Sequence, residues 1–81
     1  MKEFTDTDIE RFETLADNGD TAEARAELRE LHPADIAELM RELNLRQAEW
    51  IFNLIDDKEQ KADVLMELDE EDRKKLLEDM D

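Results

Sequence analysis

The sequence predicts an all-α protein, organised as a right-handed superhelical array of short helical hairpins with about six helices. Three observations predict this class. The 81 residues include one glycine and one proline, so residues that interrupt helices are almost absent. Apolar residues recur at the three- and four-residue spacing of an amphipathic helix. A two-helix pattern is also repeated along the chain at a fixed offset of 25 residues.

The repeated pattern joins the segment 33–55 to the segment 58–80. In a repeat of this kind, each unit buries its apolar face against the neighbouring units, as in a solenoid. Apolar residues of the first segment recur in the second as the pairs Ala37/Ala62, Leu39/Val64, Met40/Leu65, Leu43/Leu68, Ile51/Leu76, Phe52/Leu77 and Ile55/Met80.

Two helices are predicted before this repeat. Thr7 with Glu10 has the spacing of a capping box, which starts a helix over Asp8–Asn18. Asp20 with Glu23 has the same spacing and starts a second helix, whose apolar stripe of Ala24, Leu28 and Leu31 is thinner. We expect residues 1–6 to form a flexible leader and residues 7–81 to form a single helical-repeat domain.

Four more helices are predicted within the repeat. Pro33 has no N–H and a fixed φ, which suit the first turn of a helix. The later helices begin at caps with a partner three residues on. These cap pairs are Asn44/Gln47, Asp57/Gln60 and Asp69/Asp72. The expected helices are Pro33–Leu43, Leu45–Ile55, Lys58–Leu68 and Glu70–Met80.

The balance of charge limits the partners of this chain. It has 26 acidic and 11 basic residues, a formal net charge of −15. This charge argues against nucleic acid and against unaided docking to anionic lipid, and it attracts cations or basic protein surfaces. No apolar run approaches the roughly 18 residues of a membrane span, so we expect no direct membrane insertion by this segment.

No catalytic group is evident in the sequence. The chain has no cysteine, and His32 is its only histidine, placed before Pro33 at a helix start. No nucleophile stands beside a base. We therefore expect no enzymatic activity.

Acidic residues form a row on the helix that starts at Lys58. Glu59, Asp63 and Glu67 follow one another at i, i+4 spacing, where like charges destabilise a helix. A row without a basic partner is a candidate cation site, because magnesium takes oxygen ligands and is commonly held by one or two carboxylates. In so acidic a chain such rows arise by chance, so the spacing alone favours a solvated face over a cation site. The predicted apolar face opposite the row consists of Ala62, Leu65 and Met66.

Trp50 and Leu54 lie one step round from the apolar stripe of their helix. They are either core residues between repeats or an exposed ridge that binds a partner. Both interpretations are open from the sequence.

Four runs of residues carry a resemblance to a known family. They are LHPADIAELMREL at Leu31–Leu43, WIFNLI at Trp50–Ile55, ADVLMEL at Ala62–Leu68 and DEEDRKKLLEDM at Asp69–Met80. Together they resemble the N-terminal cytoplasmic domain of MgtE-type magnesium transporters, over roughly Asp20 to Met80. In that family the domain continues further, so the resemblance implies a domain truncated at its C-terminal end.

The resemblance implies a function and a site. The parent protein would be a homodimer at the cytoplasmic face of the bacterial inner membrane, with a CBS domain and a membrane domain as partners. The acidic residue of the family's A-[DE]-V-L stretch helps bind the Mg²⁺ that holds this domain to the CBS domain and favours the closed pore. Asp63 occupies that position here, one methylene shorter than Glu. The alternative is a helical-repeat protein-docking module with no metal role, which recognises a basic or apolar segment through Trp50 and the groove between repeats.

Overall fold

The computed structural model describes residues 4–79, with side chains described through residue 78, and this part of the chain is helical without strands. The all-α prediction is therefore confirmed, with six helices. Their bounds are α1 Asp6–Asn18, α2 Thr21–Leu28, α3 Pro33–Glu42, α4 Leu45–Leu54, α5 Lys58–Glu67 and α6 Glu70–Asp79.

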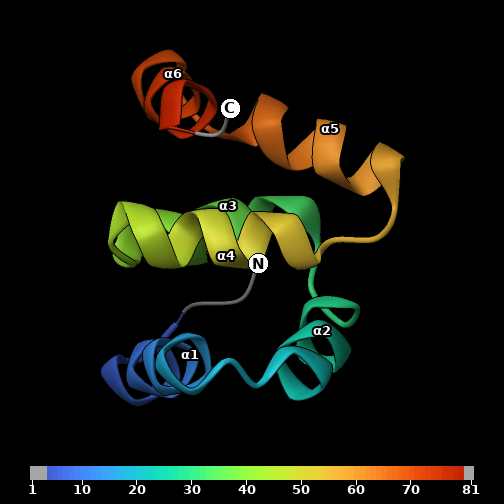
Figure 1. Ribbon diagram of the computed structural model, residues 1–81. Coiled ribbons are helices and arrows are strands. Elements are labelled where there is room, and N and C mark those ends of the chain that lie inside the picture. The colour runs from blue at the N-terminus through green and yellow to red at the C-terminus, as the bar shows by residue number, and fades with distance from the viewer. Residues whose placement is uncertain (1–3, 80–81) are drawn as a thin grey trace.

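The helices are stacked as three layers of two (Figure 1). The middle layer consists of α3 and α4, with α1 and α2 on one side and α5 and α6 on the other. Helix α4 contacts both α1 and α2 as well as α6, and α3 packs closely against α5. A helix with apolar residues on most of its circumference requires this cover on more than one side.

The core lies mainly in the middle layer. Most of the buried apolar side chains come from α3, α4 and the residue that follows each of them. Ile36, Leu39 and Ile51 are completely buried there. The outer layers contribute fewer buried residues each, which are Phe12, Leu15, Ala24 and Leu28 on one side and Val64, Leu68 and Leu76 on the other.

The 25-residue repeat is visible in the structure. The starts of α3 and α5 differ by 25 positions, and so do those of α4 and α6. Equivalent residues that face between these layers are buried in both units, as the pairs Leu39/Val64, Leu43/Leu68 and Ile51/Leu76. Other equivalent residues differ in burial between the two units. Ala37 and Phe52 are buried, whereas Ala62 and Leu77 are exposed.

Two of the predicted helix starts have the expected caps. The Asn44 side chain accepts from the Gln47 N–H at 2.8 Å, and the Gln47 side chain accepts from the Asn44 N–H at 3.2 Å. The Asp69 carboxylate accepts from the Asp72 N–H at 2.8 Å. These bonds satisfy N–H groups that have no partner within the helix.

The start of α1 differs from the prediction. The helix begins at Asp6 and not at Asp8, because Thr5 and Asp8 form the capping box in place of Thr7 and Glu10. The earlier cap places Phe4 before the cap, and Phe4 packs partly buried against the core. The apolar contact favours this register, as in a hydrophobic staple. Residues 1–3 of the predicted leader lie outside the described residues.

Two other predicted cap pairs do not form, because their second members bind elsewhere. Asp20 makes no side-chain cap bond, and Glu23 pairs with Arg11 of α1 at 3.1 Å. The Asp57 carboxylate accepts from the Glu59 N–H, while the Gln60 side chain donates to the Leu31 carbonyl at 3.4 Å. Glu23 and Gln60 thus bind residues outside their own helices, and the spacing of residues along the sequence does not predict such contacts.

The predicted apolar face of α5 is wrong. Val64 is its fully buried residue, with Leu65 partly buried, while Ala62 and Met66 are exposed, Met66 to 77%. Lys61 lies on the inner side, its Nζ 5.2 Å from the centroid of the Phe52 ring. Helix α5 is only weakly amphipathic, so its contact with α3 decides which face turns inward. Met80, at the end of the α6 stripe, lies outside the described residues.

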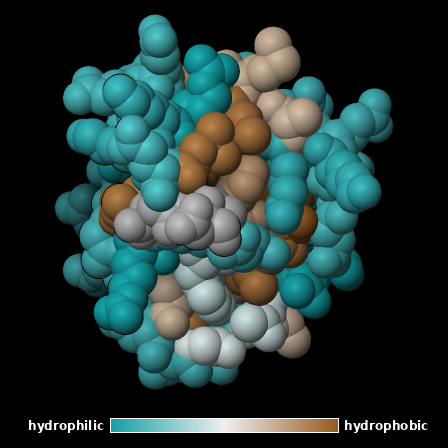
Figure 2. Space-filling model, turned by 45° about the horizontal axis from the view of Figure 1, so that its top comes forward, coloured by the Kyte–Doolittle hydropathy of each residue, from teal (hydrophilic) through white to brown (hydrophobic). Residues whose placement is uncertain are grey.

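Apolar surface remains on the outer layer. In Figure 2, the side of the molecule with α5 and α6 is turned toward the viewer, and brown surface lies among the teal side chains. The large exposed apolar residues of these two helices are Met66 and Leu77.

Neighbouring leucines on α6 test this packing. Leu76 is 2% exposed and Leu77 is 50% exposed. Leu76→Ala leaves a cavity between α4 and α6 and should lower the free energy of unfolding by about 2–5 kcal/mol. Leu77→Ala should lower it by about 1 kcal/mol or less. Urea unfolding followed by far-UV circular dichroism measures both, and equal losses would contradict the layer arrangement.

The caps give a second test. Asn44→Ala removes a cap bond and should lower the free energy of unfolding by about 1 kcal/mol. Asp20→Ala removes no cap bond and should lose about 0.5 kcal/mol or less, through the helix dipole alone. Thermal unfolding at matched salt distinguishes the two, and a larger loss for Asp20→Ala would contradict the assignment.

Candidate functional site

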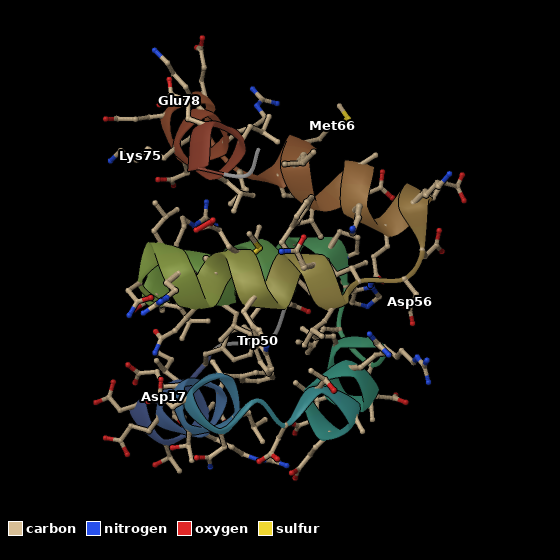
Figure 3. The ribbon with its side chains drawn as sticks, viewed as in Figure 1. Asp17, Trp50, Asp56, Met66, Lys75 and Glu78 are labelled. Atoms are coloured by element: carbon tan, nitrogen blue, oxygen red, sulfur yellow. The ribbon has the colours of Figure 1, made fainter. Side chains whose placement is uncertain are left out.

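The three acidic residues of the predicted row are all exposed on α5. Glu59, Asp63 and Glu67 are exposed, as is Met66, whereas Val64 of the same helix is fully buried. Figure 3 shows Met66 pointing outward from α5, away from α3 and α4. The structure therefore keeps the row in solvent.

The row has no basic partner among the described residues. Within this part of the chain, no lysine or arginine nitrogen lies within 4.0 Å of a carboxylate oxygen of Glu59, Asp63 or Glu67. Lysines are near in sequence, but Lys61 points toward the Phe52 ring. The repulsion between successive carboxylates is thus relieved only by solvent and salt.

Two members of the row line a hollow between α5 and α2. The hollow has a volume of about 450 Å³, and its walls include Glu59 and Asp63 on one side and Arg25 and Arg29 on the other. Glu67 does not line it. The structure therefore separates the row into two residues at a hollow and one residue beyond it.

The arginines on the far wall are already paired. Arg25 and Arg29 contact the Asp56 carboxylate at 3.5 and 3.4 Å, and Arg25 Nε also donates to the Leu54 carbonyl at 3.2 Å. Asp56 therefore neutralises one of the two arginine charges, and neither arginine forms an ion pair with Glu59 or Asp63. The sequence reasoning missed this cluster, although Arg25 and Arg29 at i, i+4 spacing gave a signal for it.

The geometry of the row limits what it can bind alone. Residues at i, i+4 are about 6 Å apart along the axis of an α-helix, so three such carboxylates do not converge on one ion. In the described residues, no group of three or more acidic, histidine or cysteine side chains is arranged to hold a metal ion. The row therefore offers one or two carboxylates to a cation, and the remaining ligands must be water or come from another surface.

Trp50 and Leu54 both belong to α4 in the middle layer, and Leu54 also lines the hollow of Glu59 and Asp63. Leu54 is a core residue, 6% exposed, and Trp50 is half-buried and packs against the core. Figure 3 places Trp50 between α4 and the layer of α1 and α2. These positions match the core interpretation of the two residues, and a partner-binding role for them stays a prediction.

Together these features define an all-helical repeat domain with an uncompensated acidic face. A family model described as the MgtE intracellular N domain matches residues 31–81, which is more than half of the chain. The chain therefore belongs to the family of N-terminal domains of MgtE-type magnesium transporters. Searches of curated proteins and of solved structures gave no match.

The matched segment coincides with the part of the fold that carries the row. It begins just before α3 and includes α5 and α6. The family is a domain of a transporter and not a family of enzymes. Among the described residues, no helix is long and apolar enough to cross a membrane.

Removing the central carboxylate should stabilise the isolated chain. Asp63→Asn eliminates two like-charge pairs, with Glu59 and with Glu67, and should raise the free energy of unfolding by about 0.4–1 kcal/mol at low salt. The gain should shrink near 1 M NaCl, where salt screens exposed charges. Urea unfolding at both salt concentrations measures it. A loss of stability at low salt would mean that the Asp63 carboxylate has a favourable partner.

Proposed function

We propose that this chain is the magnesium-sensing regulatory domain of an MgtE-type transporter, and that Asp63 and Glu59 face a CBS domain across a shared Mg²⁺ ion. The observation that carries the proposal is the exposed acidic row of α5, which has no basic partner in the described residues. Membership of the family supplies the transporter context.

The two carboxylates fit an Mg²⁺ ion shared with a partner surface better than an ion bound by this chain alone. Two carboxylates at the edge of an open hollow supply the oxygen ligands that Mg²⁺ prefers, and water fills the remaining positions. Asp63 and Glu59 would hold the ion, while Glu67 lies outside the hollow and raises the negative potential. The isolated domain therefore binds Mg²⁺ weakly and completes the site only with a partner surface.

Regulation follows from electrostatic repulsion. Two acidic surfaces repel when Mg²⁺ is scarce, and a divalent ion between them relieves the repulsion in the docked state. The ion shifts the equilibrium only by its difference in affinity for the docked and separated states. The docked state corresponds to the closed pore, so magnesium limits its own entry.

With this function, the domain lies at the cytoplasmic face of the bacterial inner membrane. It is attached to the CBS and membrane domains of a parent protein that is a homodimer. This chain contributes charge and shape to the docked state and no chemical catalysis.

Association with a CBS domain tests the function. Sedimentation or calorimetric titration of this chain with the CBS domain of an MgtE-type transporter should show binding that strengthens in millimolar MgCl₂, beyond NaCl of equal ionic strength. Asp63→Asn should weaken the magnesium-dependent part by about tenfold, because an Mg²⁺ ligand is lost.

Asp17→Asn is the matched control. Asp17 is also exposed, but it lies on α1 in the opposite outer layer (Figure 3), and its substitution should leave the association unchanged. If Asp63→Asn behaved like Asp17→Asn, the site would be wrong. If no magnesium dependence were seen in the unmodified chain, the sensing function would be wrong.

A further inference from the structure

A second, more apolar hollow lies at the opposite end of α5 from the hollow of Glu59 and Asp63. It has a volume of about 220 Å³ and lies between α6 and the turn that joins α3 to α4. Its lining shares no residue with the hollow of Glu59 and Asp63. We call it the α4–α6 groove. We call its apolar lining at Leu45, Ala48 and Leu76 the floor, and its charged lining at Arg41, Asp72 and Lys75 the rim.

The floor of the groove exposes apolar surface that the repeat does not require. Leu45 is the first residue of α4 and is 41% exposed, although the equivalent residue of α6 is Glu70. Ala48, one turn later, is small and leaves space above Leu76. Small-molecule pockets usually begin at roughly 300 Å³, so this groove suits an apolar side chain that projects from a partner segment.

The basic residues at the rim are already neutralised by this chain. Arg41 pairs with Glu38 at 2.8 Å, and Lys75 pairs with Glu71 at 3.8 Å. Among the described residues, no lysine or arginine lies within 4.0 Å of the Asp72 carboxylate. Figure 3 shows Lys75 directed outward from α6. The three rim residues alone have a formal charge of +1. With Glu38 and Glu71, which pair with the two basic residues beside the groove, the local charge is −1, on a chain of net charge −15.

We infer that the α4–α6 groove docks a basic amphipathic protein segment. An aliphatic or aromatic side chain of the segment occupies the floor beside Leu45, and a lysine or arginine one turn away faces Asp72. This is the recognition mode of an amphipathic helix in a groove, where apolar anchors supply affinity. The negative charge of the whole chain accelerates the encounter with a basic partner and rejects an acidic one.

Three designed peptides test the chemistry of the occupant. The first is an amphipathic helix of leucine and lysine, the second replaces lysine with glutamate, and the third replaces leucine with serine. Titration of the ¹⁵N-labelled 81-residue chain should show shifts at Leu45, Ala48 and Leu76 with the leucine–lysine peptide. The other two peptides should bind at least tenfold more weakly.

Matched variants test the location. Leu45→Ser should weaken binding of the leucine–lysine peptide by roughly three- to tenfold, because an exposed anchor contact is lost. Leu77→Ser, a similarly exposed leucine outside the groove, should leave binding unchanged. Asp72→Asn should weaken it by about two- to fivefold, within the range of an exposed ion pair. Circular dichroism confirms that each variant remains helical.

Several results would overturn the inference. Equal binding of the serine–lysine peptide would show attraction by charge alone, and tighter binding of the leucine–glutamate peptide would show a basic site. Shifts centred on Met66 and Leu77, or equal effects of Leu45→Ser and Leu77→Ser, would place the occupant on the outer face of α5 and α6. Self-association of the chain that is abolished by Leu45→Ser would identify a second copy as the occupant instead.

Asp63→Asn should not alter peptide binding in the groove. Failure of this inference and failure of the magnesium proposal can therefore be distinguished.

Discussion

The fold depends on the burial of the α3–α4 pair from both sides. These two helices carry most of the apolar core, and neither outer layer has enough buried surface of its own to form a comparable core. An 81-residue chain buries only about 60–65% of the surface that its unfolded form exposes, so stability requires that the most apolar helices be covered completely. Helix α4 meets this requirement through contacts with α1, α2 and α6.

The same constraint explains why equivalent residues of the repeat have different environments. Residues that face between α3–α4 and α5–α6 are buried in both units, because each unit covers the other. Other equivalent residues differ: Phe52 of the middle layer is buried, with Lys61 of α5 beside its ring, whereas Leu77 of the outer layer is exposed. In a stack of repeats, the burial of a residue depends on whether a neighbouring repeat covers it, as well as on the sequence of its own repeat.

Charge is distributed around this stack in two ways. Some acidic residues form pairs that link layers or helices, as Glu23 does with Arg11 and Asp56 does with Arg25 and Arg29. The α5 row has no such pair in the described residues and stays exposed beside a hollow. The proposed cation surface and the α4–α6 groove therefore lie at different places on the same outer pair of helices, and each suits a partner of a different kind.

The sequence by itself determined the helical class, the number of helices and the 25-residue repeat. It did so because Pro33, the Asn44–Gln47 cap and the apolar stripes are local signals that do not depend on distant residues. It also located the acidic row and the family, since both depend on residue identity and order. The sequence could not show that Asp63 has no basic partner among the described residues, because pairing across helices depends on where each side chain is directed.

Only the tertiary structure decided the inward face of α5, the first cap of α1 and the layout of the hollows. Helix α5 has too little periodicity to orient itself, so contact with α3 turned Val64 inward and left Met66 outside. The start of α1 was decided by the packing of Phe4, which made the Thr5 cap more favourable than the Thr7 cap. In both helices, burial of apolar surface against distant parts of the chain selected the arrangement that local spacing did not predict.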